Sequence, residues 1–204
     1  MFEIVTICTG NICRSPLAEL LLRQRLADLG VTVHSAGTRG LVGTQMTEEA
    51  RELAVARGIP IDQAEAHRAR WLEERHLATP DLVLAMAREH RRAVVELSPS
   101  RLRSTFTVRE FARLARTLDD RELTATADAA GADATARLRA LVALIAAQRG
   151  MSQPLADPLD DDVVDPYRRS WKTYELSAAQ LEPAIDEVVR VVRLAMARHA
   201  PVAD

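Results

Sequence analysis

The stretch CTGNICRSP, residues 8–16, most constrains what this chain can fold into. It follows an apolar run at residues 2–7 and precedes leucines at helical spacing, namely Leu17, Leu20 and Leu21. This order predicts a buried strand, then a tight loop, then a helix. Such a loop points successive backbone N–H groups inward and binds an anion at the N-terminus of the helix. Because a cysteine stands where the strand ends, the segment predicts a phosphate site with a nucleophile at its base.

The residue types in this loop suit phosphoryl transfer. The thiolate is the reactive form of Cys8, and a helix N-terminus or a nearby cation lowers the pKa of a thiol. Arg14 offers a planar fork of donors for two phosphate oxygens, which lysine lacks. Ser15 is placed to hydrogen-bond the Cys8 sulfur and to stabilise it as a leaving group. Gly10 lets the phosphate approach the backbone closely, and Asn11 can adopt a left-handed conformation or brace the loop through its amide.

Residues 8–16 resemble the signature of the low-molecular-weight protein tyrosine phosphatases. Further segments resemble that family in the same order along the chain: Ser35-Ala36-Gly37-Thr38, His67-Arg68-Ala69-Arg70, residues 81–86 and Asp165-Pro166-Tyr167. The resemblance covers residues 1 to about 106 and 165 to about 198, and it fails between them. It implies an α/β fold with a four-stranded parallel sheet flanked by helices, a helical insertion, and no metal or cofactor.

The resemblance also assigns roles to particular residues. Cys8 is the expected nucleophile, and Arg14 is expected to hold the phosphate together with the loop from Thr9 through Gly10, Asn11, Ile12 and Cys13 to Ser15. Residues 155–170 supply candidates for the acid that must protonate a leaving phenolate. The family pattern selects Asp165 over the other aspartates, which are Asp157, Asp160, Asp161 and Asp162.

The remaining expected site residues form walls and supports. Tyr167 is expected to be an aromatic wall for the substrate ring. Ser35 and His67, together with Asn11, resemble the network that braces the phosphate loop in the family. Cys13 has two interpretations: a packed small residue, or a thiol that captures an oxidised Cys8 in a reversible disulfide. The resemblance favours the second, as protection of the nucleophile.

Three activities on this fold compete. Arsenate reductases need further cysteines downstream, and none follows Cys13 in this sequence. Arginine phosphatases carry Thr where this chain has Ile12, and an apolar side chain suits an aromatic ring. Residues 40–43 resemble the bacterial exopolysaccharide-associated branch, in which a leucine borders the pocket, so Leu41 is the candidate specificity residue. The expected substrate is therefore a phosphotyrosine protein, with a bacterial tyrosine kinase as a candidate; a binding module without activity is the alternative of another class.

Composition sets the broad class of protein. The chain has 204 residues and 48% hydrophobic content, which suits one domain over residues 1–204. A formal net charge of −2 gives no support for nucleic-acid binding. The sequence shows no apolar run long enough for a bilayer and no signal-peptide pattern. With only two cysteines, both in one loop, we expect a cytoplasmic protein of unspecified oligomeric state.

Periodicity predicts the order of the elements. Strands are expected at residues 3–8, 31–35, 81–86 and 105–108, and helices at 16–29, 47–57, 71–77, 88–97 and 174–198. Strands that alternate with helices predict a parallel sheet with its ligand at the carboxyl ends of the strands. Residues 110 to about 154 predict two or three inserted helices, because residues 138, 141, 142 and 145 form one apolar stripe. We expect His34, His76, His90 and His199 to be exposed, and residues 200–204 to fray.

Overall fold

The computed structural model describes residues 1–153 and 155–197. Its centre is a sheet of four parallel strands in the order β2-β1-β3-β4. The strands are β1 (Glu3–Cys8), β2 (Thr32–Gly37), β3 (Leu82–Ala85) and β4 (Thr105–Thr107). The predicted fold class is confirmed. The register pairs Cys8 with Gly37, so the cysteine lies at the carboxyl edge of the sheet.

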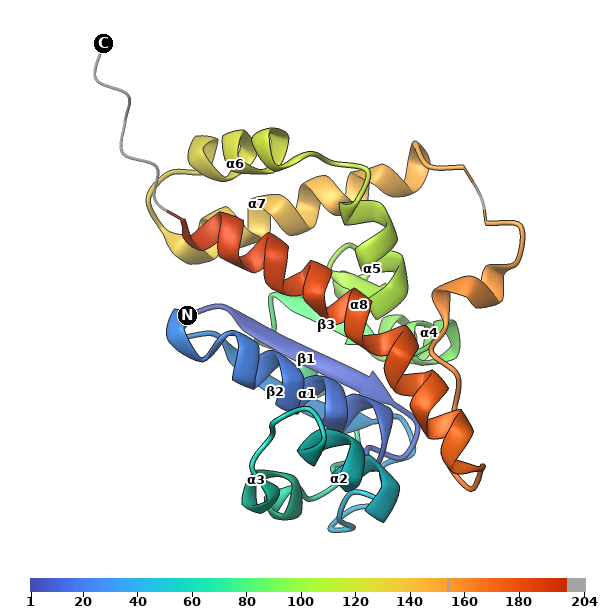
Figure 1. Cartoon of the computed structure of the whole chain (residues 1–204). Helices are drawn as coiled ribbons and strands as arrows, with labels where there is room; N and C mark the ends of the chain where they lie inside the picture. Colours follow the sequence, from blue (N-terminus) through green and yellow to red (C-terminus); the bar gives the residue numbers. More distant parts are fainter. Residues whose placement is uncertain (154, 198–204) are drawn as a thin grey trace.

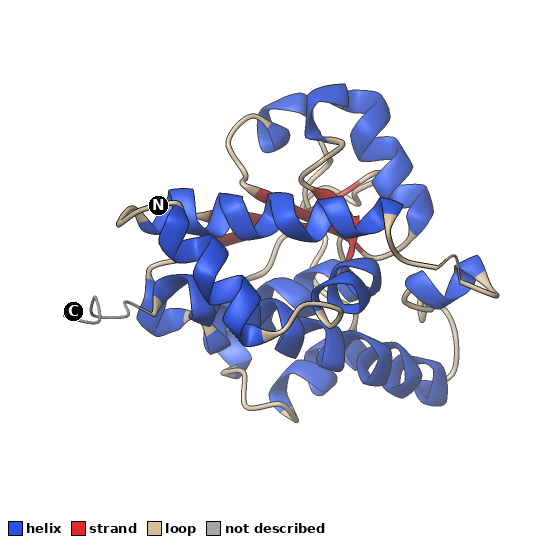
Figure 2. Cartoon of the chain, turned by 90° about the horizontal axis from the view of Figure 1, so that it is seen from above, coloured by secondary structure: helices blue, strands red, loops and turns tan. Residues whose placement is uncertain are grey.

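The sheet is buried on both faces, as a parallel sheet requires. Side chains alternate along β1, so that Ile4 packs into the larger apolar core while Val5 and Ile7 pack into a smaller one. The smaller core also contains Val83 of β3 and Val94 of a covering helix. Figure 2 shows helices on both sides of the strands. This double burial fixes β1 firmly, and with it the position of the residue at its end.

Eight α-helices surround the sheet in the described part of the chain (Figure 1). They are α1 (Arg14–Arg25), α2 (Glu48–Val55), α3 (Ile61–Ala66), α4 (Arg88–Leu97), α5 (Val108–Ala115), α6 (Asp120–Ala129), α7 (Ala134–Ala147) and α8 (Trp171–Met196). The long helix α8 packs against α1 and α2 on one side and against α5, α6 and α7 on the other. It therefore joins the N-terminal half of the molecule to the helices that precede it in the chain.

Local capping explains where several helices begin. The Thr47 side chain accepts a hydrogen bond from the backbone of Ala50 at the start of α2. Thr107 forms a reciprocal capping box with Glu110 at the start of α5. Asp119 and Asp133 cap α6 and α7 in the same manner, although Asp119 forms only one half of a capping box. The helices expected between residues 110 and 154 are thus present.

The structure corrects some predicted boundaries. Helix α1 begins at Arg14, two residues early, and ends at Arg25; a separate 3₁₀ turn (Ala27–Leu29) precedes Gly30. The helix expected at 71–77 is only a 3₁₀ turn (Glu74–Leu77), because Trp71 instead bridges to Gly37 beside the sheet. The short helix α3 was not predicted. Residues 200–204 and His199 lie outside the described residues.

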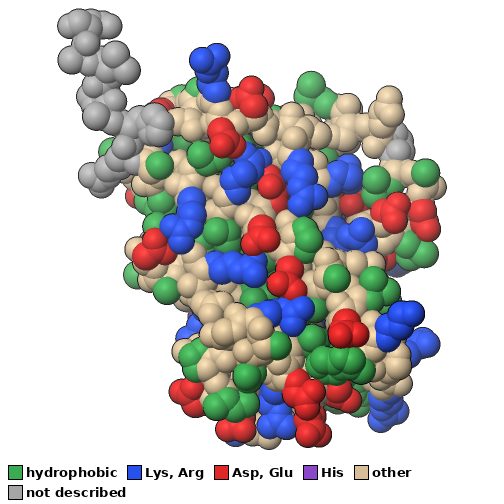
Figure 3. Space-filling view, viewed as in Figure 1, with side chains coloured by type: hydrophobic (Ala, Val, Ile, Leu, Met, Phe, Trp, Pro, Cys, Tyr) green, Lys and Arg blue, Asp and Glu red, His purple; other side chains and the backbone are tan. Residues whose placement is uncertain are grey.

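The surface is mixed in charge where it can be seen. Figure 3 shows Lys and Arg side chains interspersed with Asp and Glu over the face that α8 crosses. Ion pairs account for part of this pattern, such as Arg57 with Glu182 and Arg193 with Asp28. Among the described helices, including α8 with 26 residues, none has the length and apolar character needed to cross a bilayer.

Candidate active site

The loop from Cys8 to Arg14 wraps around a buried sulfur. Cys8 is 2% exposed, and its Sγ accepts a hydrogen bond from the backbone N–H of Asn11 at 3.3 Å. The Ser15 hydroxyl lies 3.0 Å from the same sulfur. Helix α1 begins at Arg14, so its positive N-terminal end points into this loop. Hydrogen-bond donors and the helix dipole both favour negative charge here.

Asn11 holds the loop in shape from inside. It is fully buried and has a left-handed backbone with φ of 57°. Its Nδ2 donates to Ser15 Oγ at 3.0 Å and to Ser35 Oγ at 2.8 Å, while its Oδ1 accepts from the Arg70 backbone N–H at 2.9 Å. Its carbonyl oxygen lies 2.8 Å from His67 Nε2. The structure thus brings Asn11, Ser35 and His67 together around the loop.

Arg14 connects the loop to the segment that carries the candidate acid. Its Nη2 lies 2.9 Å from Asp165 Oδ2, and its Nη1 donates to the Val163 carbonyl at 3.0 Å. The guanidinium is 4% exposed, whereas the Asp165 side chain is 51% exposed. One buried cation therefore sets the position of an accessible carboxylate at the mouth of the site.

A cavity of about 240 Å³ opens above the sulfur. Its apolar walls include Ile12, Leu41 and Tyr167, and its polar groups include Arg14 and Asp165. Leu41 and Tyr167 are partly exposed, which leaves the cavity open to a side chain from outside. The full lining is Cys8, Thr9, Gly10, Ile12, Cys13, Arg14, Arg39, Leu41, Asp165 and Tyr167. The sequence did not single out Arg39.

The other four candidate aspartates contact other residues or line a different groove. Asp161 accepts two hydrogen bonds from Arg113, and Asp162 accepts one from the backbone N–H of Arg88 at the start of α4. Asp157 caps a 3₁₀ turn (Pro158–Asp161), and Asp160 lines a separate groove beside α5. Of the five candidates, Asp165 is the one that lines the cavity above Cys8.

Contacts with β3, β4 and α5 anchor the segment before Asp165. The backbone N–H of Val163 donates to the Met86 carbonyl at 2.8 Å. Thr107 Oγ1 donates to the Asp161 carbonyl at 2.6 Å, and Arg109 donates to the Asp162 carbonyl at 2.7 Å. These bonds tie the acid segment to the carboxyl edge of the sheet, which is where β1 delivers the cysteine.

Two buried polar residues near the loop, His90 and Glu19, were not predicted from the sequence. The prediction that His90 is exposed was wrong: it is 1% exposed, and its Nε2 lies 2.8 Å from Thr9 Oγ1 in the loop. Burial, and to a smaller degree the nearby Arg14, lowers the pKa of His90 to about 3. Glu19 of α1 is also buried and accepts a hydrogen bond from Ser35 at 2.5 Å. The sequence feature that could have indicated its burial is that Glu19 is an acidic residue within the apolar run at residues 17–22.

Cys13 lines the same cavity but lies in a less polar setting. Its Sγ is 3.6 Å from Thr47 Oγ1 and 3.7 Å from Tyr174 Oη. Burial raises the pKa of the Cys13 thiol to about 11, so at neutral pH it is protonated. Both cysteines are free thiols in the structure.

A model of the low molecular weight phosphotyrosine protein phosphatases matches residues 3–123, more than half of the chain. The chain belongs to this family. Etp from Escherichia coli K12, named a low molecular weight protein-tyrosine-phosphatase, is 43% identical over 97 residues, which are 48% of this chain and 62% of Etp. That match therefore spans less than two thirds of Etp.

Other members of the family differ in the activity that their names state. A protein-arginine-phosphatase from Geobacillus stearothermophilus is 36% identical over 110 residues, which are 54% of this chain and 71% of that protein. The crystal structure of a low molecular weight protein tyrosine phosphatase from T. tengcongensis has a TM-score of 0.63 and 29% identity, covering 93% of this chain and 98% of that one. The family is established, and the choice of substrate depends on the site.

Proposed function

We propose that this chain is a cysteine-dependent protein tyrosine phosphatase that hydrolyses phosphotyrosine through a cysteinyl-phosphate intermediate. The observation that carries the proposal is the meeting of Cys8, Arg14 and Asp165 in one cavity, with Arg14 bonded to Asp165 at 2.9 Å. A nucleophile, a phosphate-binding cation and a proton donor are the groups that phosphate monoester cleavage by a thiol requires. Family membership supports the same reaction.

In the first step the Cys8 thiolate attacks phosphorus, an S–P bond forms, and the P–O bond to tyrosine breaks. The Asn11 N–H donates a hydrogen bond to this sulfur, and the Ser15 hydroxyl lies 3.0 Å from it. Arg14 and the loop amides, which include those of Thr9, Gly10, Ile12 and Cys13, stabilise the charge on the phosphoryl oxygens. Asp165 gives its proton to the departing phenolate.

In the second step water attacks the phosphoryl group and gives a proton to Asp165. The S–P bond breaks, inorganic phosphate leaves, and Cys8 returns as a thiolate that Ser15 stabilises. Asp165 ends this step protonated, as the next cycle requires. Asn11, Ser35 and His67 act as positioning residues, since they touch the loop and not the reacting atoms.

The walls of the cavity favour an aromatic leaving group. Ile12, Leu41 and Tyr167 offer apolar surface to a phenyl ring, and Ile12 offers no polar contact to a guanidinium. Arginine phosphatase activity remains the second candidate, because a relative bears that name. An arsenate reductase would need a cysteine after Cys13, and residues 14–204 contain none.

We further propose phosphotyrosine proteins as substrates, with a bacterial tyrosine kinase as a candidate, and a cytoplasmic location. The free thiols support a reducing compartment. We also propose that residues 110–154, which form α6, α7 and part of α5, are a helical insertion within one domain covering residues 1–204. The match to the family model ends at residue 123, within this proposed insertion.

The deciding experiment compares turnover of a phosphotyrosine peptide and a phosphoarginine peptide of the same sequence, with Cys8→Ser as the control. Release from phosphotyrosine that requires Cys8 supports the proposal, and preference for phosphoarginine replaces it with the second candidate. Asp165→Asn tests the acid: it should slow phosphotyrosine by about 10²-fold or more. An aryl phosphate with a good leaving group should lose much less, since its oxygen leaves without a proton.

A further inference from the structure

Arg39 is a cation on the cavity wall that the chemistry proposed above does not use. Its side chain is exposed and lines the cavity together with Leu41 and Tyr167. Within the described residues it makes no side-chain hydrogen bond or ion pair, in contrast to Arg14, whose charge Asp165 offsets. The rim of the cavity therefore carries a guanidinium whose charge nothing in the described structure balances.

The backbone at Arg39 is rigidly attached to the phosphate loop. The Arg39 backbone N–H donates to the Thr9 carbonyl at 2.9 Å. Two residues later, the Leu41 backbone N–H donates to the Gly10 carbonyl at 3.1 Å. Gly40 packs so closely that a Cβ there would lie 2.1 Å from the Arg70 carbonyl oxygen. These contacts fix the Arg39 backbone beside the phosphate loop, so its side chain starts from the rim of the cavity.

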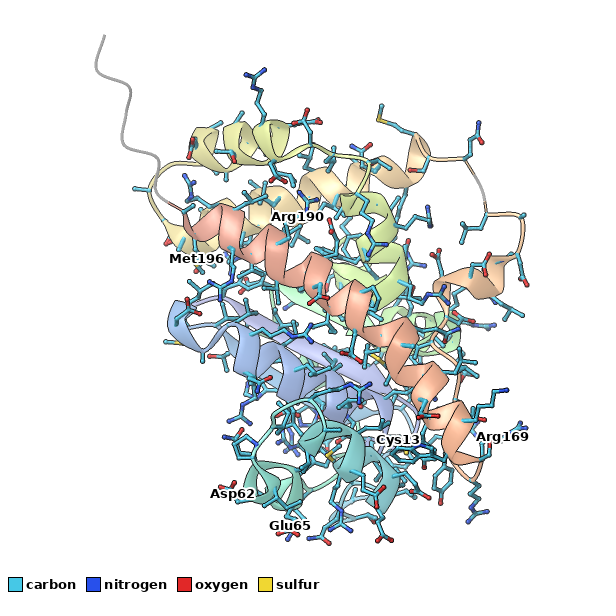
Figure 4. All side chains as sticks on the ribbon, in the orientation of Figure 1. Cys13, Asp62, Glu65, Arg169, Arg190 and Met196 are labelled. Carbon is cyan, nitrogen blue, oxygen red and sulfur yellow. The ribbon has the colours of Figure 1, made fainter. Side chains whose placement is uncertain are left out.

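A further arginine, Arg168, lies beside Tyr167, another part of the same wall, and Arg169 follows it in the chain. Arg168 has a left-handed backbone with φ of 59°, and its guanidinium carbon lies 5.1 Å from the centre of the Tyr167 ring. A left-handed conformation is costly for arginine, which marks this turn as one held in place by its surroundings. Arg169 is exposed just before α8, at the end of the molecule where Cys13 lies (Figure 4).

We propose that Arg39 binds a carboxylate of the substrate protein beside the phosphotyrosine, so that the chain prefers phosphotyrosines flanked by Asp or Glu. The inference rests on the proposed phosphatase function, and it names the class of protein segment that the site accepts. The phosphate goes to the loop at the bottom of the cavity, and the ring lies between the apolar walls. The residues next to the phosphotyrosine then reach the rim, where Arg39 stands and where Arg168 adds positive charge.

The experiment uses three phosphotyrosine peptides that differ only in their flanking residues, which are Glu, Gln or Lys. Turnover is measured for the unchanged chain, Arg39→Gln and Arg39→Glu, and para-nitrophenyl phosphate serves as a substrate without flanks. Arg103→Gln is the matched control, because Arg103 is also exposed but precedes β4, at the opposite edge of the sheet from Cys8. Binding of the same peptides to Cys8→Ser, with and without Arg39→Gln, gives a readout independent of turnover.

For one exposed guanidinium–carboxylate pair, we expect the Glu peptide to exceed the Gln peptide by about two- to fivefold in kcat/KM. The difference should lie in KM, because the contact is the same in the ground state and the transition state. Arg39→Gln should remove this preference, and Arg39→Glu should reverse it toward the Lys peptide. Because Arg39 lines the cavity, para-nitrophenyl phosphate turnover is measured for each variant, which separates an effect common to all substrates from the effect on the flanking residues. Arg103→Gln should behave as the unchanged chain.

The inference is overturned if the unchanged chain shows no preference for the Glu peptide, or if the preference survives Arg39→Gln. Failure of the proposed function looks different: no substrate, para-nitrophenyl phosphate included, is then hydrolysed in a manner that requires Cys8. In that case binding to the Cys8→Ser chain still decides the role of Arg39, since tighter binding of the Glu peptide must depend on that side chain.

Discussion

Replacing Asn11 by Ala removes the side chain of a fully buried residue. Three hydrogen bonds disappear: those to Ser15 and Ser35, and the one from the Arg70 backbone N–H. Ser15 retains its contact with the Cys8 sulfur, and Ser35 retains Glu19. The Arg70 N–H is the group that loses its partner outright.

The expected loss follows from these contacts. Three buried hydrogen bonds at about 1 kcal/mol each contribute about 3 kcal/mol to the free energy of unfolding. Alanine tolerates the left-handed backbone less well than asparagine, which adds about 1 kcal/mol. For a chain of this length, a total of about 4 kcal/mol lowers Tm by roughly 10 °C. The loop should also lose its shape, so kcat should fall together with stability.

Urea unfolding of Asn11→Ala measures this loss, and para-nitrophenyl phosphate turnover below the midpoint measures the effect on the loop. Gln24→Ala is the matched control, since Gln24 is an exposed amide whose Nε2 donates to the Gly58 carbonyl at 2.9 Å. That change should cost about 0.5 kcal/mol or less, in the range of ordinary surface substitutions. The reasoning is refuted if Asn11→Ala costs no more than Gln24→Ala, or if turnover is unchanged.

Three further predictions concern the acid segment, the cavity wall and pH. Arg113→Ala removes the two hydrogen bonds to Asp161. It should lower turnover of a phosphotyrosine peptide about fivefold, a loss of about 1 kcal/mol, and should lower para-nitrophenyl phosphate turnover much less. Equal losses for the two substrates would contradict this prediction. Gly40→Ala forces the backbone apart and should cost about 1–3 kcal/mol in urea unfolding, whereas Gly150→Ala, which meets no neighbour, should cost little. Because the pKa of His90 falls from 6.5 to about 3 on folding, the unfolded chain binds a proton that the folded chain does not. Stability is therefore full above pH 6.5 and declines as the pH falls toward 3, by up to about 1.4 kcal/mol per pH unit from this group. His90→Asn should make that decline shallower, and identical slopes would rule the reasoning out.

Sequence patterns predicted best what depends on local order. The limits of β1 and α4 agree with those predicted, because an apolar run or a helical stripe with clear ends leaves little choice. The loop at residues 8–16 was predictable for the same reason, because its cysteine, arginine and turn residues are all contiguous. Asp165 was selected by its neighbours Pro166 and Tyr167, which set it apart from the other aspartates nearby.

The features that were not predicted depend mostly on contacts between distant segments. Arg39 follows a strand in a loop, and nothing in its neighbours says that the loop bonds to Thr9. His90 was expected to be exposed, although His90 and Val94 lie one turn apart on the inner face of α4. That spacing was visible in the sequence. The anchoring of the acid segment by Arg113 joins parts of the chain that no motif connects.

Arg14, near the start of the sequence, bonds to Asp165, which lies far along it. A ribosome releases β1 and its cysteine first, and the acid segment follows only after α5, α6 and α7 have emerged. A partly synthesised chain therefore has the thiol and the cation but lacks the proton donor. Under the proposed mechanism such a chain lacks the group that protonates the departing phenolate. Under the proposed mechanism, turnover therefore requires the late-synthesised part of the chain, which includes α8 packed against α1.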